Sequence, residues 1–322
     1  MAAVRACCVV GGSGFVGSRL VARLAGDGVA VLVPTRHPER CGDLRVLPAV
    51  RLVQADVHAP GVLEALLRDC DAVVNLVGIL NEPGRDGAGF RRAHVDLAGR
   101  LVAACQAAGV DRLVQVSALN AVDPAAPDPA TSHYLRTKGE AEAVIRASAL
   151  RWTILQPSVI FGPGDSFLNR FARLLRTIPL VFPLAMAGTR FSPVHVADVA
   201  EAVVRTLADP ATTGRTYALC GPGTWTLGEL VGKVARTLGL RRRIIPLPRP
   251  VARLQAAIMD FVPGKPFSTD NYRSLLRDST GTTEGLRALG IRPRPLEPEL
   301  PAVLGGEGVP GVRDSFRRRA RR

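Results

Sequence analysis

The chain has 322 residues, 47% of them hydrophobic, and a formal net charge of +14. This length allows one large or two unequal domains with a full core, so we expect a soluble globular protein. The longest apolar run outside the first fold unit, residues 178–186, is interrupted by Pro179 and Pro183 and is too short to span a bilayer, so no transmembrane helix is predicted.

Residues 1–5 lead directly into the first predicted strand and leave no room for a signal peptide. We therefore expect a cytoplasmic protein, with a peripheral position at the inner face of the plasma membrane as the alternative. The six cysteines lack a C-x-x-C pair and are expected to be reduced core residues. The sequence has neither a cluster with metal-ligand spacing nor a G-x-S-x-G nucleophile elbow.

Much of the positive charge lies in the C-terminal third, at residues 241–243 and 317–322. Few aromatic residues lie among these arginines for base stacking, so nucleic acid is not an expected partner. An anionic membrane surface, an acidic protein partner and a solvated basic surface all remain open.

Residues 7–17 read CCVVGGSGFVG, an apolar strand that runs into three spaced glycines at the start of a helix. Gly11 permits a tight turn, Gly14 lets backbone N–H groups approach a pyrophosphate, and Gly17 lets the helix lie close to the strand. The phosphate would then meet a helix N-terminus, where unpaired N–H groups and the macrodipole favour an anion. This arrangement predicts a dinucleotide-binding site.

Apolar β-rich runs then alternate with amphipathic helical patterns. Strands are expected at residues 29–33, 50–54, 72–76, 113–117 and 152–155, and helices near 14–25, 60–69, 88–108 and 132–148. This alternation predicts an α/β protein with a doubly wound parallel sheet, the Rossmann architecture. The ligand crevice should lie at the carboxyl ends of the strands.

The pattern divides the chain into three segments. We expect a nucleotide-binding domain over residues 1–157, a smaller α/β substrate-side lobe of the same unit over 158–304, and a basic, disordered tail over 305–322. In the lobe, the capping box from Thr226 to Glu229 predicts a helix that runs to about Leu238. The proline-rich segment 123–129 is expected to form a loop over the site.

After the second predicted strand the chain reads VPTRH (33–37), with no carboxylate to hold a ribose 2′-hydroxyl. Arg36 can instead face a 2′-phosphate, so NADP(H) is favoured, with NAD(H) as the alternative. The structural alternative is an exposed loop arginine. Asp56 is a candidate for the adenine amino group or for loop capping, and Asn75 and Gly78 are expected to line the same crevice.

Tyr134 and Lys138 are four residues apart, on one face of a predicted helix. A nearby ammonium favours phenolate and moves a tyrosine toward the range of a general base, and a lysine can also hydrogen-bond a nicotinamide ribose. An exposed surface pair is the alternative, and the preceding glycine turn and strands favour the catalytic interpretation.

Together these residues resemble the extended short-chain dehydrogenase/reductase family over roughly residues 4–290. The resemblance implies a Tyr/Lys pair at the nicotinamide and a hydroxyl residue after the fifth strand that polarises the substrate. That strand ends Ser117-Ala118 here. If Ser117 matches the family's first serine, the substrate-facing hydroxyl is replaced by Ala118; with a shift of one residue, Ser117 supplies it.

A closer resemblance is to the nucleotide-binding accessory subunit of respiratory complex I and its bacterial relatives. It rests on five segments: NLVGIL (75–80), SALNA (117–121), HYLRTKGEAE (133–142), PSVIFGPGDSFLNRFA (157–172) and PVHVADVAEAV (193–203). It implies tight NADPH binding with little or no turnover, beside the quinone-reducing arm at the membrane. Pro157 and Val159 would then hold the nicotinamide ring.

The expected catalytic residues are Tyr134, Lys138 and Ser117. The expected cofactor-binding residues are Gly11, Ser13, Gly14, Phe15, Val16, Gly17, Arg36, Asp56, Val57, Asn75, Val77, Gly78, Tyr134, Lys138, Pro157 and Val159. Packing between lobes is the favoured role for Phe161 and Phe167. His195 and Asp198 precede or begin a helix and are interpreted as structural.

Apolar residues recur at helical spacing over 251–261, at Val251, Leu254, Ala257, Ile258 and Phe261. We favour packing of this face on the protein's own core, because most amphipathic helices pack that way. The flanking arginines also suit an anionic membrane interface or a partner.

These observations lead to three hypotheses. The first is an NADP(H)-binding accessory or quinone-linked protein with little or no turnover, whose partners are respiratory-chain subunits or an anionic membrane surface. The second is an active NAD(P)-dependent oxidoreductase or epimerase that uses Tyr134 and Lys138 on an unknown small molecule. The third is a regulator that senses NADP(H) without chemistry.

Overall fold

The computed structural model describes residues 4–126, 128, 130–262 and 265–305. The tail expected to be disordered, residues 305–322, lies outside the described residues except for Gly305. Part of the predicted 123–129 loop is likewise not described.

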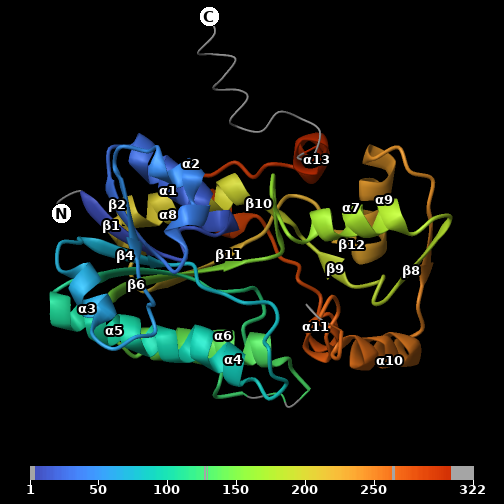
Figure 1. The fold of residues 1–322 in the computed structure, drawn as a ribbon, viewed down its shortest axis with the longest axis horizontal. Helices are drawn as coiled ribbons and strands as arrows, with labels where there is room; N and C mark the ends of the chain where they lie inside the picture. Colours follow the sequence, from blue (N-terminus) through green and yellow to red (C-terminus); the bar gives the residue numbers. More distant parts are fainter. Residues whose placement is uncertain (1–3, 127, 129, 263–264, 306–322) are drawn as a thin grey trace, which may run out of the picture.

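A seven-stranded parallel sheet forms the centre of the molecule, in the order β11-β6-β5-β4-β1-β2-β3 (Figure 1). Its strands are β1 (Ala6–Val10), β2 (Ala30–Thr35), β3 (Val50–Gln54), β4 (Ala72–Asn75), β5 (Arg112–Val116), β6 (Arg151–Pro157) and β11 (Arg215–Leu219). Residues 7–10 of β1 are all buried, because helices cover both faces of a parallel sheet. The predicted doubly wound architecture is confirmed.

Two helical layers enclose the sheet (Figure 1). One comprises α1 (Phe15–Gly26), α2 (Gly42–Arg45), α8 (Val196–Ala208) and α12 (Glu284–Ala288), and the other α3 (Val62–Leu67), α5 (Leu97–Ala108) and α6 (His133–Arg146). A short helix α4 (Ala88–Arg91) continues through a π-helical turn η2 (Arg92–Asp96) into α5. Each layer packs its apolar stripe on the sheet, with Leu20 in the first core and Leu101 in the second.

The chain leaves the sheet after β6 and returns to it in β11, where Leu219 pairs with Pro157. Helix α8 of the same stretch packs against α1. Residues that follow position 157 therefore contribute both to the nucleotide-binding sheet and to the smaller lobe.

The smaller lobe has its own core, which includes Leu175, Leu230 and Leu300. Its helices are α7 (Leu168–Thr177), α9 (Leu227–Thr237), α10 (Arg249–Met259), α11 (Thr269–Ser274) and α13 (Leu296–Leu304). Its paired strands are β7 (Ile160–Phe161) with β10 (Val194–His195), β8 (Val181–Leu184) with β13 (Arg243–Pro246), and β9 (Arg190–Phe191) with β12 (Trp225–Thr226). Single 3-10 turns, η1 (Pro38–Arg40) and η3 (Pro210–Thr212), complete the described elements.

The predicted capping box at the start of α9 is confirmed. The hydroxyl of Thr226 accepts a hydrogen bond from the Glu229 N–H at 3.1 Å, and the Glu229 carboxylate accepts one from the Thr226 N–H at 2.7 Å. All six cysteines are free, and five of them are buried, as expected for reduced core residues.

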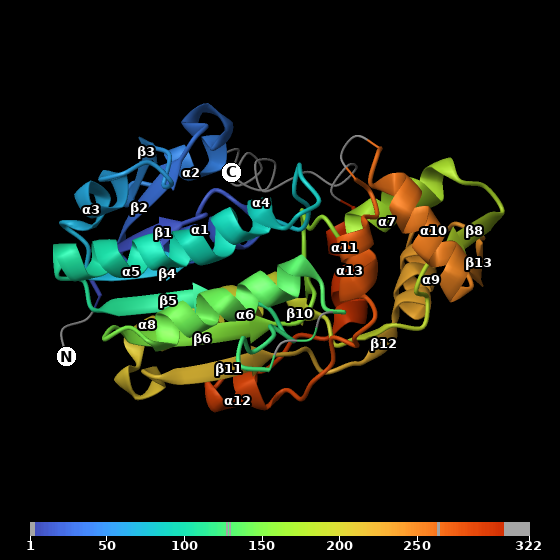
Figure 2. The ribbon, with the colours of Figure 1, turned by 90° about the horizontal axis from the view of Figure 1, so that it is seen from below.

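Helix α10 corrects one expectation, because its large apolar side chains do not pack on the core. Val251, Leu254 and Ile258 of the helix and Phe261 just after it, called here the α10 apolar face, are between 47% and 73% exposed. The buried residues of the helix are Ala252 and Ala256, whose small side chains form its inward side. Helix α10 lies at the outer surface of the lobe beside α11 (Figure 2). None of the described helices has the length and apolar composition that a bilayer crossing requires.

Candidate nucleotide site

The glycine turn has the close packing that its spacing predicted. Gly11 has φ +82°, and the N–H groups of Gly12 and Gly14 donate to the carbonyls of Val9 and Gly11, both at 3.1 Å. A Cβ added to Gly17 would lie 2.3 Å from the Gly11 carbonyl oxygen. Only glycine at position 17 lets α1 lie this close to the turn.

The N-terminus of α1 is open to an anion. Its N-cap residue is Gly14, and within the described residues no side chain caps the first turn. Phe15, Val16 and Gly17 carry no negative charge, and Ser13 beside them is exposed. The backbone donors and helix dipole are thus presented without a competing carboxylate, which fits the pyrophosphate of a dinucleotide.

The expected adenine side lies at the ends of β2 and β3. Arg36 follows β2 directly, is exposed, and makes no ion pair or hydrogen bond with a described residue. Asp56 accepts a hydrogen bond from the His58 N–H at 3.0 Å, so its loop-capping alternative is realised. Val57 packs on the second core.

Two further arginines of this region were not found from the sequence. Burial lowers the pKa of His58, and Arg92, Arg100 and Arg36 lower it further. Arg100 also donates to the His58 carbonyl at 2.5 Å. Arg92 and Arg100 are eight residues apart on one helical stretch, and this spacing was the available signal for a shared face.

The side chain of Asn75 is hydrogen-bonded to the neighbouring strand and to its own loop. Its amide donates to Gln115 at 2.8 Å, and its side-chain oxygen accepts from the Val77 N–H at 3.1 Å. Gly78 has a spatial role instead, because a Cβ there would lie 3.1 Å from the Lys138 ammonium. The loop after β4 therefore leaves space for the lysine.

Lys138 is buried between two strand ends. Its ammonium donates to the carbonyls of Val77 at 3.3 Å and Val116 at 3.4 Å. Burial lowers the pKa of Lys138 to about 8. The ammonium thus lies at the carboxyl ends of β4 and β5, where the fold predicts a ligand.

Tyr134 is partly buried against aromatic neighbours, with ring centroids 6.1 Å from Phe90 and 5.6 Å from His94. Burial raises the pKa of Tyr134 to about 12. This direction is opposite to the one expected for a phenol assisted by a close ammonium. Among the described contacts no hydrogen bond joins Tyr134 to Lys138, whose ammonium is held by backbone carbonyls.

Ser117 follows β5 and is only 5% exposed, yet its hydroxyl has no hydrogen-bond partner in the described part of the chain. Its neighbour Val116 accepts from Lys138, so the serine and the lysine lie at the same strand end. A buried hydroxyl without a partner fits a site that a polar ligand completes. Ala118 is buried against Val122 and Leu135.

The segment that leaves β6 has mixed roles. The carbonyls of Pro157 and Val159 accept from Leu119 at 2.9 Å and Val194 at 3.0 Å, which fixes the backbone expected beside the nicotinamide. Phe161 and Phe167 belong to the third core, the smaller lobe's own, rather than to an interface between lobes.

The structural interpretation of His195 and Asp198 agrees with their contacts. His195 caps α8 through the Ala197 N–H at 3.3 Å, and Asp198 accepts from the Arg294 N–H at 2.8 Å.

Sequence reasoning missed His94, which lies in the π-helical turn behind the Tyr/Lys pair. Its Nδ1 is 2.8 Å from the Thr137 hydroxyl, and its Nε2 accepts from the Ile79 N–H at 3.4 Å. Burial and the nearby Lys138 lower the pKa of His94 to about 2, so the ring is neutral. A π-turn frequently marks a functional site, but no sequence pattern announced this one.

Asp270 of the smaller lobe was also missed. Its carboxylate accepts from the N–H groups of His133 at 2.6 Å and Tyr134 at 3.2 Å. It thus caps the helix that carries Tyr134 and Lys138.

A family model described as NAD(P)H-binding matches residues 11–210. The chain belongs to this NAD(P)H-binding family. It is 31% identical to the mitochondrial NADH dehydrogenase [ubiquinone] 1 alpha subcomplex subunit 9 of Mus musculus, over 92% of this chain and 78% of that protein. The predicted resemblance to the accessory subunit is thereby confirmed.

Two further matches are a reductase related in sequence and an epimerase of similar fold. A ceramide reductase of Caulobacter vibrioides is 29% identical, over 78% of this chain and 76% of its own. A crystal structure of UDP-glucuronic acid 4-epimerase from Bacillus cereus superposes with a TM-score of 0.74 at 17% identity, covering 94% of this chain and 98% of the other. The epimerase establishes likeness of fold alone.

Proposed function

We propose that this protein is an NADP(H)-binding accessory protein of the respiratory chain, akin to the alpha subcomplex subunit 9 of complex I, in which the nucleotide has a structural or sensing role. The observation that carries the proposal is the uncapped N-terminus of α1 behind Gly11 and Gly17. The similarity to the mouse subunit, over 92% of this chain and 78% of that protein, supports the assignment to respiratory-chain partners.

The preference for NADP(H) rests on Arg36. This side chain follows β2 and is exposed, and residues 33–37 contain no carboxylate that would select a free ribose hydroxyl. A guanidinium suits a 2′-phosphate because its donors form a planar fork. NADH is the competing ligand in the test.

Low turnover is supported by the state of the Tyr/Lys pair. With a pKa near 12, Tyr134 is a poor general base at neutral pH, and the Lys138 ammonium already donates to two carbonyls. If Ser117 matches the family's first serine, the buried Ala118 replaces the substrate-facing hydroxyl, which also supports low turnover.

A second candidate is an active reductase, which the relative named ceramide reductase favours. A neutral Tyr134 would give its proton to a carbonyl oxygen, with Ser117 polarising that oxygen and Lys138 holding the nicotinamide ribose. NADPH supplies the hydride when bound. A site with a neutral tyrosine as proton donor predicts carbonyl reduction rather than alcohol oxidation at neutral pH.

The proposal includes a position at an anionic membrane surface, supported by the exposed α10 apolar face and the basic residues beside it. Such a position is compatible with a peripheral partner of a membrane-embedded respiratory complex.

Calorimetry and thermal unfolding test the nucleotide assignment. A ligand at 100 times its dissociation constant adds about 2.7 kcal/mol to the free energy of unfolding, so NADPH should raise Tm clearly. Purification from native membranes tests the partners, and co-migration with respiratory subunits is expected. Absence of heat and of stabilisation with both NADPH and NADH would overturn the proposal; a free pool with carbonyl-dependent NADPH oxidation would favour the reductase.

A further inference from the structure

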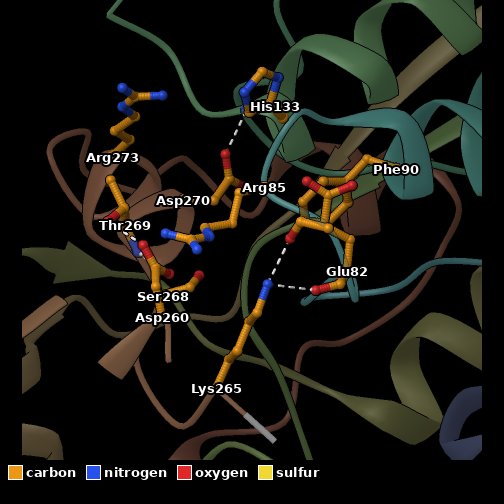
Figure 3. Close-up of a pocket in the computed structure, with 11 residues that line it drawn as sticks. Glu82, Arg85, Phe90, His133, Asp260, Lys265, Ser268, Thr269, Asp270 and Arg273 are labelled. Atoms are coloured by element: carbon orange, nitrogen blue, oxygen red, sulfur yellow. Dashed lines mark hydrogen bonds between the residues drawn. The ribbon is translucent and has the colours of Figure 1, made fainter. Parts of the chain in front are cut away.

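A cavity of about 220 Å³ lies between the loop before α4 and the α10–α11 segment. Figure 3 shows Arg85, Phe90 and His133 on one side and Lys265, Asp270 and Arg273 among the residues on the other. Phe90, which lines it, contacts Tyr134 with ring centroids 6.1 Å apart, and none of the predicted nucleotide-binding residues lines the cavity.

The carboxylates of this cavity are occupied by internal donors. Both oxygens of Glu82 accept from backbone N–H groups at 2.8 Å. Asp260 accepts from the Thr269 N–H at 3.1 Å and its hydroxyl at 2.6 Å, and Asp270 caps α6. Each of these carboxylates thus accepts two hydrogen bonds from within the protein.

The cationic side chains of the cavity differ in whether they have partners within the protein. The Lys265 ammonium donates to three backbone carbonyls of residues 82–84, at 2.9, 3.1 and 2.5 Å. The guanidinium groups of Arg85 and Arg273, by contrast, make no hydrogen bond or ion pair within the described residues. The charged donors left to a ligand here are two guanidinium groups, which bind phosphate oxygens well.

Arg85 also joins the cavity to the α10 apolar face. Its guanidinium carbon lies 4.2 Å from the centroid of the Phe261 ring, a cation–π contact. Along the same helix, Arg249 and Arg253 line a shallow groove beside Leu254. Arginine donors thus lie beside exposed apolar side chains at Phe261 and at Leu254.

We propose that this cavity binds the phosphate of an anionic phospholipid while the α10 apolar face enters the acyl boundary of the bilayer. Arginine donors beside an exposed apolar helix face match a lipid, which carries both groups in one molecule. The inference deepens the membrane position in the proposed function and is independent of nucleotide binding.

The test is co-sedimentation of the full-length protein with phosphatidylcholine vesicles, with and without phosphatidylglycerol. The protein should prefer the anionic vesicles. Each arginine near an anionic surface contributes about fivefold, so Arg85→Ala with Arg273→Ala should weaken anionic-vesicle binding about 30-fold. Lysine at both positions should restore most of it.

The matched control removes two exposed arginines at the other end of the molecule, Arg51→Ala with Arg68→Ala, and should change binding less than about twofold. Leu254→Ser with Phe261→Ser should weaken binding to both vesicle types, because it removes the apolar contact rather than the charge selectivity.

Three outcomes would overturn the inference: no binding to either vesicle, equal binding to both, or equal losses in the cavity and control pairs. NADPH stabilisation is measured on the same variants and should be retained. Absence of selective vesicle binding by the wild-type protein, with intact NADPH stabilisation, refutes the lipid site alone, whereas selective vesicle binding without any NADPH effect refutes the nucleotide assignment alone.

Discussion

The carboxylate of Asp270 accepts a 2.6 Å hydrogen bond from the backbone N–H of His133, although 137 residues separate them. His133 is the first residue of α6, so a side chain of the smaller lobe closes the N-terminus of the Tyr134 helix. The same carboxylate also accepts from the Tyr134 N–H. The smaller lobe thereby fixes where the candidate catalytic helix begins.

Replacing Asp270 tests this cross-lobe cap. Asp270→Ala should lower the free energy of unfolding by about 1–2 kcal/mol, because two helix N–H groups lose their acceptor. Asp270→Asn keeps an acceptor oxygen and should cost less. Urea unfolding checks both, with Asp69→Ala as an exposed control. Equal effects of the alanine and asparagine variants would contradict the capping role.

Gly17→Ala should abolish stabilisation by NADPH, because the added Cβ would press on the Gly11 carbonyl and push α1 away from the turn. Gly26→Ala, at the end of the same helix, meets no atom within 4 Å and should raise the free energy of unfolding by about 0.5–1 kcal/mol. Thermal unfolding with and without NADPH measures both. Retained NADPH stabilisation in Gly17→Ala would show that the nucleotide binds elsewhere.

Arg36→Ala should weaken NADPH binding by about 10- to 100-fold, the effect of losing a charge-assisted contact to phosphate, and leave NADH binding nearly unchanged. Titration calorimetry with each nucleotide gives the ratio of the NADPH and NADH dissociation constants for the wild type and the variant. Arg51→Ala removes an equal charge from β3 and serves as control. Parallel losses for both nucleotides would remove Arg36 from 2′-phosphate recognition.

Lys138 predicts a pH dependence of stability. Its pKa is lowered from 10.5 to about 8 by burial, so between these values the unfolded chain holds more protons than the folded one. The contribution of this residue to the free energy of unfolding therefore rises with pH in that window, by about 3 kcal/mol. Urea unfolding without nucleotide measures this effect. From pH 8 to 10.5 the free energy of unfolding of the wild type should rise relative to that of Lys138→Met. Parallel curves would mean that the lysine is not desolvated.

Tyr134→Phe distinguishes the two functional candidates. The ring contacts with Phe90 and His94 remain, so stability and NADPH binding should change little. Any carbonyl-dependent NADPH oxidation should fall by at least about 100-fold, because the proton donor is lost. An unchanged rate would exclude Tyr134 from the chemistry.

Local patterns predicted the nucleotide-binding sheet well. The strand and turn over residues 7–17 are specified by residues near one another in sequence, as are the capping box of α9 and the helical stretch 88–108. The seventh strand, β11, was not singled out, because its pairing with β6 depends on a return of the chain from the first part of the smaller lobe.

Contacts between distant segments were beyond the sequence pattern. Amphipathic spacing identified α10 but could not show which side is covered, and the alanines rather than the larger residues face inward. Asp270 gave no signal at all, because a capping carboxylate from another lobe has no local signature. The commitment of Asn75 to Gln115 likewise depends on the neighbouring strand.

The return of β11 divides the smaller lobe into two stretches of chain, one between β6 and β11 and one that follows β11. A fragment ending at residue 157 would leave the outer backbone groups of β6 without a neighbour, and such an edge invites pairing with other chains. The nucleotide-binding half should therefore aggregate when produced alone.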